Sequence, residues 1–340
     1  MKRLVLSAFV IIFLFWGFLP LTGNAAEKVI TLRFAHFVPS NNIEGQLMQQ
    51  WANEVEKRTN GRVKVTIYPG STVLGMDQMY DGITKEIADI GYGNFSAYRG
   101  RFLLTEVIDL PLGYKNFSTD TRLANAYYKK FRPKELDDVK VLFLQGLAPG
   151  LLHSVKPISR LEDVKGRKIR ALGVSGRIVT ALGGAPVGIP MVDTYDALSK
   201  GIVEGVLINW GGAFNYKMGE VTKNHLIAPA IGYGTNLYIV MNKDKWNSLP
   251  PDIQAIIDKF DEEWINWLPQ KWGGEWDANG KAGIEKMGNK VTTLSKEEND
   301  RWALLMKPIF DDYVKAAKAK GLPGDEALKF CVDYLKANDK

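Results

Sequence analysis

The sequence predicts an α/β protein with two lobes of similar construction, and three observations support this fold class. Apolar segments with the spacing of β-strands alternate along the chain with segments of helical spacing. Residues 80–89 resemble residues 195–204, and each copy has the pattern of a helix end that leads into a strand. From Pro251 onwards, apolar residues recur every three or four positions, which predicts long C-terminal helices.

The internal similarity is the observation that favours two lobes. The two segments share Tyr, Asp, Lys and Ile in register, so each half of the chain would supply the same helix–turn–strand unit on its own side of a cleft. Chance, or a common helix-to-strand turn, is the alternative explanation. With 340 residues, the chain is long enough for two domains.

The predicted elements follow one another in a regular order. Apolar and polar residues alternate over 32–36, which predicts a half-buried strand, and helical spacing follows from Ile43 to Val55. Gly61 ends this helix, and a second strand is expected over 63–67, before Pro69. Further strands, covered on both faces, are predicted at 139–144, 168–170, 206–208 and 238–241.

The C-terminal third is expected to be helical. Apolar residues over 253–267 keep helical spacing until Pro269, which lacks an amide donor and interrupts the helix. A further helix is predicted to begin at Ser295, where Glu298 completes a capping box. The tryptophans of these helices could form a platform for ligand stacking, but their helical spacing favours packing in the core.

The N-terminus has the pattern of an export signal. Two basic residues, Lys2 and Arg3, precede an apolar run from Leu4 to Leu19 and a tail of small residues. The sequence therefore predicts a signal peptide over 1–26, cleaved after Ala25 or Ala26. A transmembrane anchor is the alternative, but the apolar run is shorter than the roughly 20 residues needed to span a bilayer. An exported chain without disulfides fits a bacterial periplasm.

Composition and motifs argue against several functional classes. The single cysteine, Cys331, cannot form an intramolecular disulfide, and the three histidines lie far apart in the sequence, so neither a metal site nor a cofactor is expected. Acidic and basic residues are interleaved despite a net charge of +6, so nucleic-acid binding is not expected. No nucleophile elbow, phosphate loop or dinucleotide fingerprint is present. We therefore predict no catalytic residues and no enzyme.

Residues 165–173 contain the strongest candidate for an anion site. A predicted strand ends at Arg170, and a helix is expected to begin near Ser175. The guanidinium group and the free amides of the helix N-terminus would face the same space, and both favour a carboxylate. The alternative is an ordinary surface arginine at a strand end.

The order of motifs along the chain resembles the substrate-binding subunits of tripartite ATP-independent periplasmic (TRAP) transporters, of the DctP type. The resemblance covers essentially the whole chain after the signal, and rests on the segments Leu32–Ala35, Gly61–Val63, Tyr68–Ser71, Leu74–Gly75, Asp89–Gly91, Leu110–Pro111, Lys165–Arg170 and Val203–Gly205.

The resemblance implies a two-lobed periplasmic-binding-protein fold with a central ligand cleft. It implies that Arg170 forms an ion pair with the carboxylate of an organic acid, and that the protein delivers this acid to the small and large membrane subunits of a TRAP permease. We expect residues 27–147 and 234–275 to form the first lobe, and residues 148–233 and 276–340 to form the second lobe.

Two departures from the family pattern bear on the ligand. Some members carry a second arginine about 20 positions before the first, but here that place falls near Gly150. The polar residues that often follow Val-Asp-Gly are replaced by Val206-Leu207-Ile208. Because buried polar groups of a ligand need partners, we expect a monocarboxylate with an apolar or aromatic body. Aromatic acids, branched 2-oxo acids and short dicarboxylates all stay open.

Several residues near the predicted strand ends are candidates for the pocket wall. Besides Arg170, they are His36, Phe37, Asn94, Phe95, His153, Asn209, Trp210, Phe214 and the segment from Tyr233 to Asn236. Three other functions stay open beside a TRAP receptor: a binding protein of an ATP-driven importer, a sensory ligand receptor and an exported two-lobed enzyme.

Overall fold

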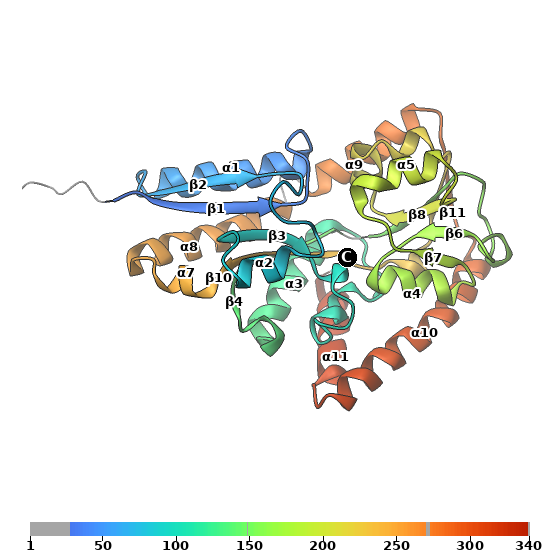
Figure 1. Cartoon of the computed structure of the whole chain (residues 1–340). Helices are drawn as coiled ribbons and strands as arrows, with labels where there is room; N and C mark the ends of the chain where they lie inside the picture. The colour runs from blue at the N-terminus through green and yellow to red at the C-terminus, as the bar shows by residue number, and fades with distance from the viewer. Residues whose placement is uncertain (1–27, 148, 270–272, 339–340) are drawn as a thin grey trace, which may run out of the picture.

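Two β-sheets divide the described chain into two lobes that lie side by side (Figure 1). The computed structural model describes residues 28–147, 149–269 and 273–338, so the predicted signal peptide, 1–26, lies outside the described residues. The prediction of a two-lobed α/β fold with long C-terminal helices is confirmed. Within the described ranges, no helix is long and apolar enough to cross a membrane.

The first sheet has the strand order β2-β1-β3-β10-β4. Strand β1 pairs in parallel with β2 and β3, and β10 runs antiparallel to both β3 and β4. All seven residues of β10 are buried, and they include the apolar run 238–241 that was predicted to be covered on both faces. The strands are β1 (Ile30–His36), β2 (Val63–Tyr68), β3 (Ile90–Asn94), β4 (Val139–Gly146) and β10 (Asn236–Asn242).

The second sheet repeats this arrangement. Its order is β11-β9-β5-β8-β6-β7, with β6 parallel to β7 and β8, and β5 antiparallel to β8 and β9. Read from β7 to β9, the order and directions match those from β2 to β4 in the first sheet. The strands are β5 (Leu151–Ser154), β6 (Lys168–Arg170), β7 (Ala185–Val187), β8 (Gly205–Ile208), β9 (Asn224–Ile227) and β11 (Lys290–Thr293).

The internal sequence similarity corresponds to one structural unit in each lobe. Residues 80–89 lead from helix α2 (Met79–Thr84) to β3, and residues 195–204 lead from helix α5 (Thr194–Ser199) to β8. In both turns the amide of the isoleucine bonds the carbonyl five residues earlier, from Ile87 to Gly82 and from Ile202 to Ala197, each at 2.8 Å. The repeat therefore encodes the same turn at equivalent places in the two sheets.

Helices cover the sheets of both lobes (Figure 1). In the first lobe α1 packs on β2, whereas α3 and α8 pack on β4. In the second lobe α4 packs on β7, and α6 packs on α9. These helices are α1 (Ile43–Arg58), α3 (Phe117–Phe131), α4 (Gly173–Ala181), α6 (Trp210–Asn215), α7 (Lys243–Asn247), α8 (Pro251–Leu268) and α9 (Gly274–Lys286).

The last two helices connect the lobes. Helix α10 (Lys296–Ala319) begins at Ser295, whose hydroxyl accepts the Glu298 amide as the capping pattern predicts. It contacts α4 in the second lobe, and α11 (Gly324–Asn338) contacts α3 in the first. Figure 1 shows α10 running from beneath the second lobe to the turn where α11 begins. Residues 276–340 were expected in the second lobe; the lobe boundaries stay a prediction.

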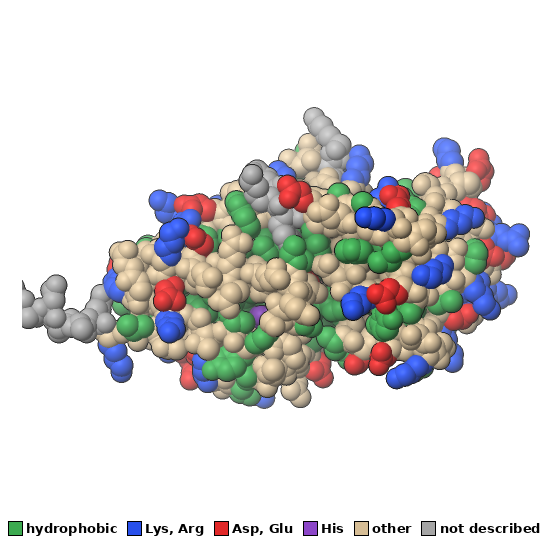
Figure 2. Space-filling model, turned by 90° about the horizontal axis from the view of Figure 1, so that it is seen from above, with side chains coloured by type: hydrophobic (Ala, Val, Ile, Leu, Met, Phe, Trp, Pro, Cys, Tyr) green, Lys and Arg blue, Asp and Glu red, His purple; other side chains and the backbone are tan. Residues whose placement is uncertain are grey.

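Charged side chains are dispersed over the surface. On the face that Figure 2 shows, basic and acidic groups are interspersed over both lobes. Among the described residues, several exposed ion pairs join charged side chains one helical turn apart, such as Lys296 with Asp300 and Lys329 with Asp333. Such pairs contribute about 0.3–0.5 kcal/mol each, so the surface charge contributes little to the stability of this fold.

The core of the first lobe contains a buried carboxyl group. The Trp51 ring packs on Phe34, Phe143 and Phe260, and its Nε1–H donates to Oδ1 of Asp261 at 2.9 Å. Among the described residues, nothing hydrogen-bonds the other oxygen, Oδ2. Burial raises the pKa of Asp261 to about 8, although the bond from Trp51 acts in the opposite direction.

An Asp261→Asn variant is expected to unfold at a higher temperature than the parent at pH 9, by about 3 °C or more, and at a similar temperature at pH 5. The folded carboxyl keeps its proton up to about pH 8, whereas the unfolded one loses it above about pH 4. Stability therefore falls as pH rises between these values, and Asn removes this loss while keeping an acceptor for Trp51.

Thermal melts of both proteins at the two pH values measure this effect. Asp312→Asn, which changes an exposed carboxylate on α10, is the control and should show no such pH-dependent gain. Equal gains at pH 5 and pH 9 for Asp261→Asn would contradict the assignment.

Candidate functional site

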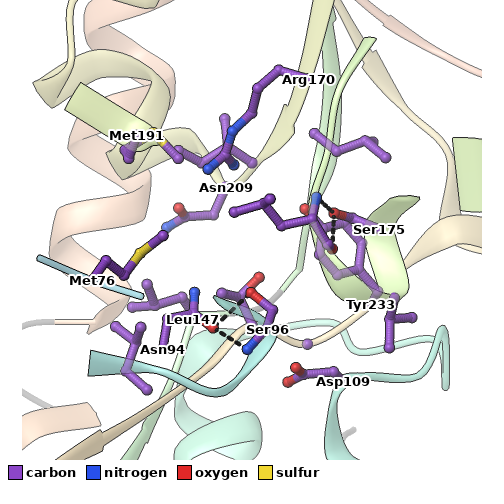
Figure 3. A pocket seen from close by; sticks show the side chains of 18 of the residues that line it. Met76, Asn94, Ser96, Asp109, Leu147, Arg170, Ser175, Met191, Asn209 and Tyr233 are labelled. Atoms are coloured by element: carbon purple, nitrogen blue, oxygen red, sulfur yellow. Dashed lines mark hydrogen bonds between the residues drawn. The ribbon is translucent and has the colours of Figure 1, made fainter. Parts of the chain in front are cut away.

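A pocket lies between the two lobes and receives side chains from both. About 750 Å³ in it, open solvent included, is not filled by protein atoms. Figure 3 shows Arg170, Met191 and Asn209 of the second lobe on one side, and Asn94, Ser96 and Asp109 of the first lobe on the other. A molecule in this pocket would therefore contact both lobes.

The segments that cross between the lobes form part of the pocket wall. The amide of Leu147 donates to the carbonyl of Thr235 at 2.9 Å, and the amide of Gly150 donates to the carbonyl of Tyr233 at 3.1 Å. Leu147, Tyr233 and Thr235 also line the pocket. The pocket is thus built directly on two connections between the lobes, β4 to β5 and β9 to β10.

Arg170 is the buried cation of this pocket. It is the last residue of β6 and is only 6% exposed. Its Nε donates to the carbonyl of Ile189 at 2.9 Å, and no carboxylate among the described residues forms an ion pair with it. Burial lowers the pKa of Arg170 to about 10, against the influence of Tyr233 and Tyr216, so the guanidinium is still charged at neutral pH.

A charge buried in this way is energetically unfavourable unless an anion compensates it. Two of the donor nitrogens of Arg170 make no hydrogen bond to the described residues, and the fork geometry of a guanidinium suits a carboxylate. The helix α4 that follows begins at Gly173, slightly earlier than expected, and Ser175 accepts the amide of Leu172 at 3.0 Å. The site can therefore bind one carboxylate.

Asn209 is held at the pocket wall by the carboxyl group of Asp277, a residue of α9. Its Nδ2 donates to Oδ1 of Asp277 at 3.1 Å, and the amide of Gly211 donates to the same oxygen at 3.0 Å. Burial raises the pKa of Asp277 to about 6. Because Nδ2 donates to Asp277, the orientation of the Asn209 side chain at the wall is fixed.

Two further carboxyl groups line the pocket on the side of the first lobe. Glu44, at the start of α1, is 4% exposed, and burial raises its pKa to about 7. Asp109 is similarly buried, its pKa is also raised to about 7 by burial, and its Oδ1 accepts both the amide and the Nδ2 of Asn236 at 2.9 Å. These groups are protonated to a large extent near neutral pH, so they repel an anion less than ordinary carboxylates do.

Most of the remaining wall is apolar. It contains Phe37, Met76, Leu147, Leu172, Val174, Met191, Leu207, Ile208, Leu237 and Trp276. Leu207 and Ile208 belong to the segment that departs from the polar family pattern. Apart from the carboxylate position, this lining favours an apolar ligand body.

Some of the residues predicted from the sequence line this pocket and others do not. Arg170, Asn209, Asn94, Phe37 and the segment 233–235 are part of its wall. Six predicted residues, His36, Phe95, His153, Trp210, Phe214 and Asn236, lie outside that wall. Their neighbours give the physical reason in each case.

His153 and Trp210 belong to a buried cluster behind the pocket. His153 Nε2 faces the carbonyl of Ile208 at 3.0 Å and must donate to it, so its Nδ1 accepts from Nδ1–H of His225 at 2.6 Å. The Trp210 ring packs edge-on against His153 at 5.3 Å. Burial lowers the pKa of His153 to about 3 and that of His225 to about 4, so both rings are neutral.

The other four residues lie at other places in the fold. Asn236 bonds Asp109, and Phe214 packs over Gly283, where a Cβ would meet its ring at 2.3 Å. Phe95 packs against Tyr238 at 5.0 Å and faces a neighbouring pocket. His36 lines a separate pocket beside α1 and β2, and burial lowers its pKa to about 4.

Sequence reasoning missed several wall residues, of which Glu44, Met76, Tyr216 and Trp276 are the most informative. An acidic residue in the first turn of a helix is expected because it interacts favourably with the helix dipole. A tryptophan at helical spacing is expected to pack in the core. Neither pattern therefore indicates a ligand site. Trp276 rests on Gly211, where a Cβ would lie 2.3 Å from its ring. Only the packing of α9 on α6 brings this ring to the pocket.

The glycine at position 150 stands where a second family arginine was considered. A Cβ on Gly150 would lie 1.9 Å from the ring of Tyr233. The tyrosine therefore fills the space that any side chain at 150 would need.

Among the described residues, no group of His, Cys, Asp or Glu side chains is arranged to hold a metal ion.

The chain is similar to a well-defined set of known proteins. The family model for bacterial extracellular solute-binding proteins, family 7, matches residues 34–316. The C4-dicarboxylate-binding periplasmic protein DctP of Rhodobacter capsulatus is 24% identical, over 91% of this chain and 94% of its own length.

Two solved structures share the fold over nearly the whole chain. A TRAP solute-binding protein from Rhodoferax ferrireducens, in complex with copurified benzoate, has a TM-score of 0.84 and 27% identity, covering 91% of this chain and 98% of its own. A marine metagenome TRAP solute-binding protein specific for aromatic acid ligands, in complex with 3-hydroxybenzoate, has a TM-score of 0.86 and 26% identity, covering 92% and 100%.

Proposed function

The chain belongs to bacterial extracellular solute-binding protein family 7, the substrate-binding subunits of TRAP transporters, and on this premise we propose that it captures an aromatic or otherwise largely apolar monocarboxylate. The acid would lie in the pocket between the lobes, with its carboxylate on Arg170. The observation that carries this proposal is the buried charge of Arg170, which has no carboxylate partner among the described residues.

The apolar wall supports the rest of the ligand assignment. One cation and a mainly aliphatic and aromatic lining match one carboxylate on an apolar body, whereas a second carboxylate would meet Glu44 or Asp109 instead of another cation. The two similar structures in complex with benzoate and 3-hydroxybenzoate agree in chemical class. Aromatic monocarboxylates are therefore placed before branched 2-oxo acids, and dicarboxylates come last.

Ligand binding would stabilise a closed arrangement of the lobes. The carboxylate contacts the second lobe at Arg170, and the body reaches wall residues of the first lobe such as Phe37, so the two lobes approach only when both contacts form. The loaded receptor would then deliver the acid to the small and large membrane subunits of a TRAP permease. Export by the signal peptide over 1–26 would place it in the periplasm.

A thermal-shift screen is expected to show selective stabilisation by aromatic monocarboxylates. At 100 times Kd, a ligand that binds only the folded form adds about 2.7 kcal/mol, which is several degrees in melting temperature. Benzoate and phenylacetate should raise the melting temperature, and benzamide, which keeps the ring but lacks the charge, should not. Succinate should act weakly. Equal shifts with benzoate and benzamide would contradict the ion pair.

A further inference from the structure

We propose that Glu44 and Tyr216 form a second polar subsite of the pocket, which selects acids that carry a hydroxyl group on their apolar body. This inference rests on the proposed function and names the substrate class more closely. The two residues come from opposite lobes: Glu44 from the first turn of α1, and Tyr216 from the C-terminal end of α6. Both line the pocket.

The hydroxyl of Tyr216 is a buried group whose hydrogen-bonding capacity is unused. Among the described residues, nothing hydrogen-bonds its Oη. Burial raises the pKa of Tyr216 well above its usual value, Glu44 adds to this rise, and Arg170 opposes it. The hydroxyl is therefore neutral, and it lies within electrostatic range of both the Glu44 carboxyl and the Arg170 guanidinium. An unpaired buried hydroxyl is unfavourable, so a ligand that pairs with it gains affinity.

The carboxyl of Glu44 has unused capacity as well. Its hydrogen bond from a side chain is a long one, from the Tyr92 hydroxyl to Oε1 at 3.5 Å, and no Lys or Arg among the described residues forms an ion pair with it. The Tyr92 ring in turn stacks on Phe37 at 5.6 Å, which fixes the position of the Tyr92 hydroxyl beside Glu44. A protonated carboxyl can both donate and accept, and burial raises the pKa of Glu44 to about 7.

A hydroxyl group is the ligand chemistry that fits these two partners. It donates one hydrogen bond and accepts others, so it can accept from one of the two protein groups and donate to the other. A second carboxylate would be repelled whenever Glu44 is ionised. Because Glu44 and Tyr216 belong to different lobes, the bridging hydroxyl would also favour closure, and an acid without it would leave Tyr216 unpaired in the closed state.

Calorimetry with matched acids tests the subsite. The probes are benzoate, phenylacetate and the three monohydroxy isomers of each, measured on the parent protein and on Tyr216→Phe, Glu44→Leu and Glu44→Gln. We expect at least one hydroxy isomer to bind about tenfold more tightly than its unsubstituted acid, the equivalent of one strong hydrogen bond. Tyr216→Phe and Glu44→Leu should each reduce this advantage, taken as the ratio of the two affinities measured on the same variant, to about threefold or less.

The Glu44→Gln variant shows whether the ligand group that binds Glu44 is a hydroxyl or a cation. Gln still donates and accepts, so the advantage of the hydroxy acid should largely persist. If 3- or 4-(aminomethyl)benzoate binds more tightly than every hydroxy isomer and Glu44→Gln abolishes this, a cation subsite replaces the proposal. The proposal is also overturned if no hydroxy isomer exceeds its parent acid, or if the advantage survives both Tyr216→Phe and Glu44→Leu. Failure of the proposed function differs, because then no acid would bind in an Arg170-dependent way.

Discussion

An Arg170→Ala variant is expected to bind benzoate, or the best acid of the screen, about 30-fold or more weakly than the parent protein. Truncating one partner of a buried charge pair removes about 2–5 kcal/mol, and 2 kcal/mol corresponds to this factor. Arg170 is 6% exposed, and its Nε is held by the Ile189 carbonyl, so the guanidinium is already oriented before a ligand arrives. Isothermal titration calorimetry measures the loss.

The same buried charge predicts an opposite effect on the unliganded protein. The Arg170→Met variant keeps most of the side-chain volume and removes the cost of burying an uncompensated cation. Its melting temperature without ligand should therefore equal or exceed that of the parent protein. The Arg170→Lys variant keeps the positive charge but loses the planar guanidinium group, which can bind a carboxylate through two hydrogen bonds. Its affinity for the acid should therefore lie between those of the parent protein and Arg170→Ala.

Lys168→Ala is the matched control for both measurements. It removes a cation two residues earlier on β6, where the side chain is exposed, and should leave affinity and melting temperature nearly unchanged. Unaltered affinity in Arg170→Ala, or an equal loss in Lys168→Ala, would exclude Arg170 as the carboxylate partner.

A Gly150→Ala variant is expected to bind about tenfold or more weakly, and to lose about 1–3 kcal/mol of stability. The added methyl would lie 1.9 Å from the Tyr233 ring, so this ring must move. Tyr233 lines the pocket, and its carbonyl accepts the amide of Gly150 at 3.1 Å, so the shift would disturb both the wall and the connection between the lobes.

Gly176→Ala is the corresponding control. Its Cβ would meet its nearest neighbour, Pro186, at 3.8 Å, an ordinary contact, and alanine is favoured over glycine within a helix such as α4. Chemical denaturation and calorimetry should therefore show equal or higher stability with unchanged binding. If Gly150→Ala behaves in the same way, the Tyr233 ring has no fixed place in the site.

The sequence predicted those features that depend on neighbours along the chain. The strand that ends at Arg170 is such a feature, because the residue type and the strand end are both local, and the structure places this side chain in the pocket. The repeat of 80–89 in 195–204 predicted two related lobes because the same turn has the same hydrogen bonds wherever it occurs.

Local pattern failed where the direction of a side chain depends on distant partners. His153 and Trp210 were expected at the wall, yet His225 from β9 and the Ile208 carbonyl hold the histidine in a cluster behind it. Asn209, adjacent to Trp210, does line the wall, because Asp277 of α9 binds its amide nitrogen. A strand or turn presents neighbouring residues to different sides, and only the packed elements decide which side is the pocket.

By itself the sequence determined the α/β class, the two related lobes, the capped C-terminal helices and the position of one arginine at a strand end, since each follows from hydrophobic spacing or from a local hydrogen-bond pattern. The tertiary structure alone decided that Glu44 and Tyr216 share one pocket, and that Tyr233 occupies the space beside Gly150. The members of each pair are far apart in the chain. They meet because the two sheets and the connections between the lobes pack against each other, which no local pattern of residues encodes.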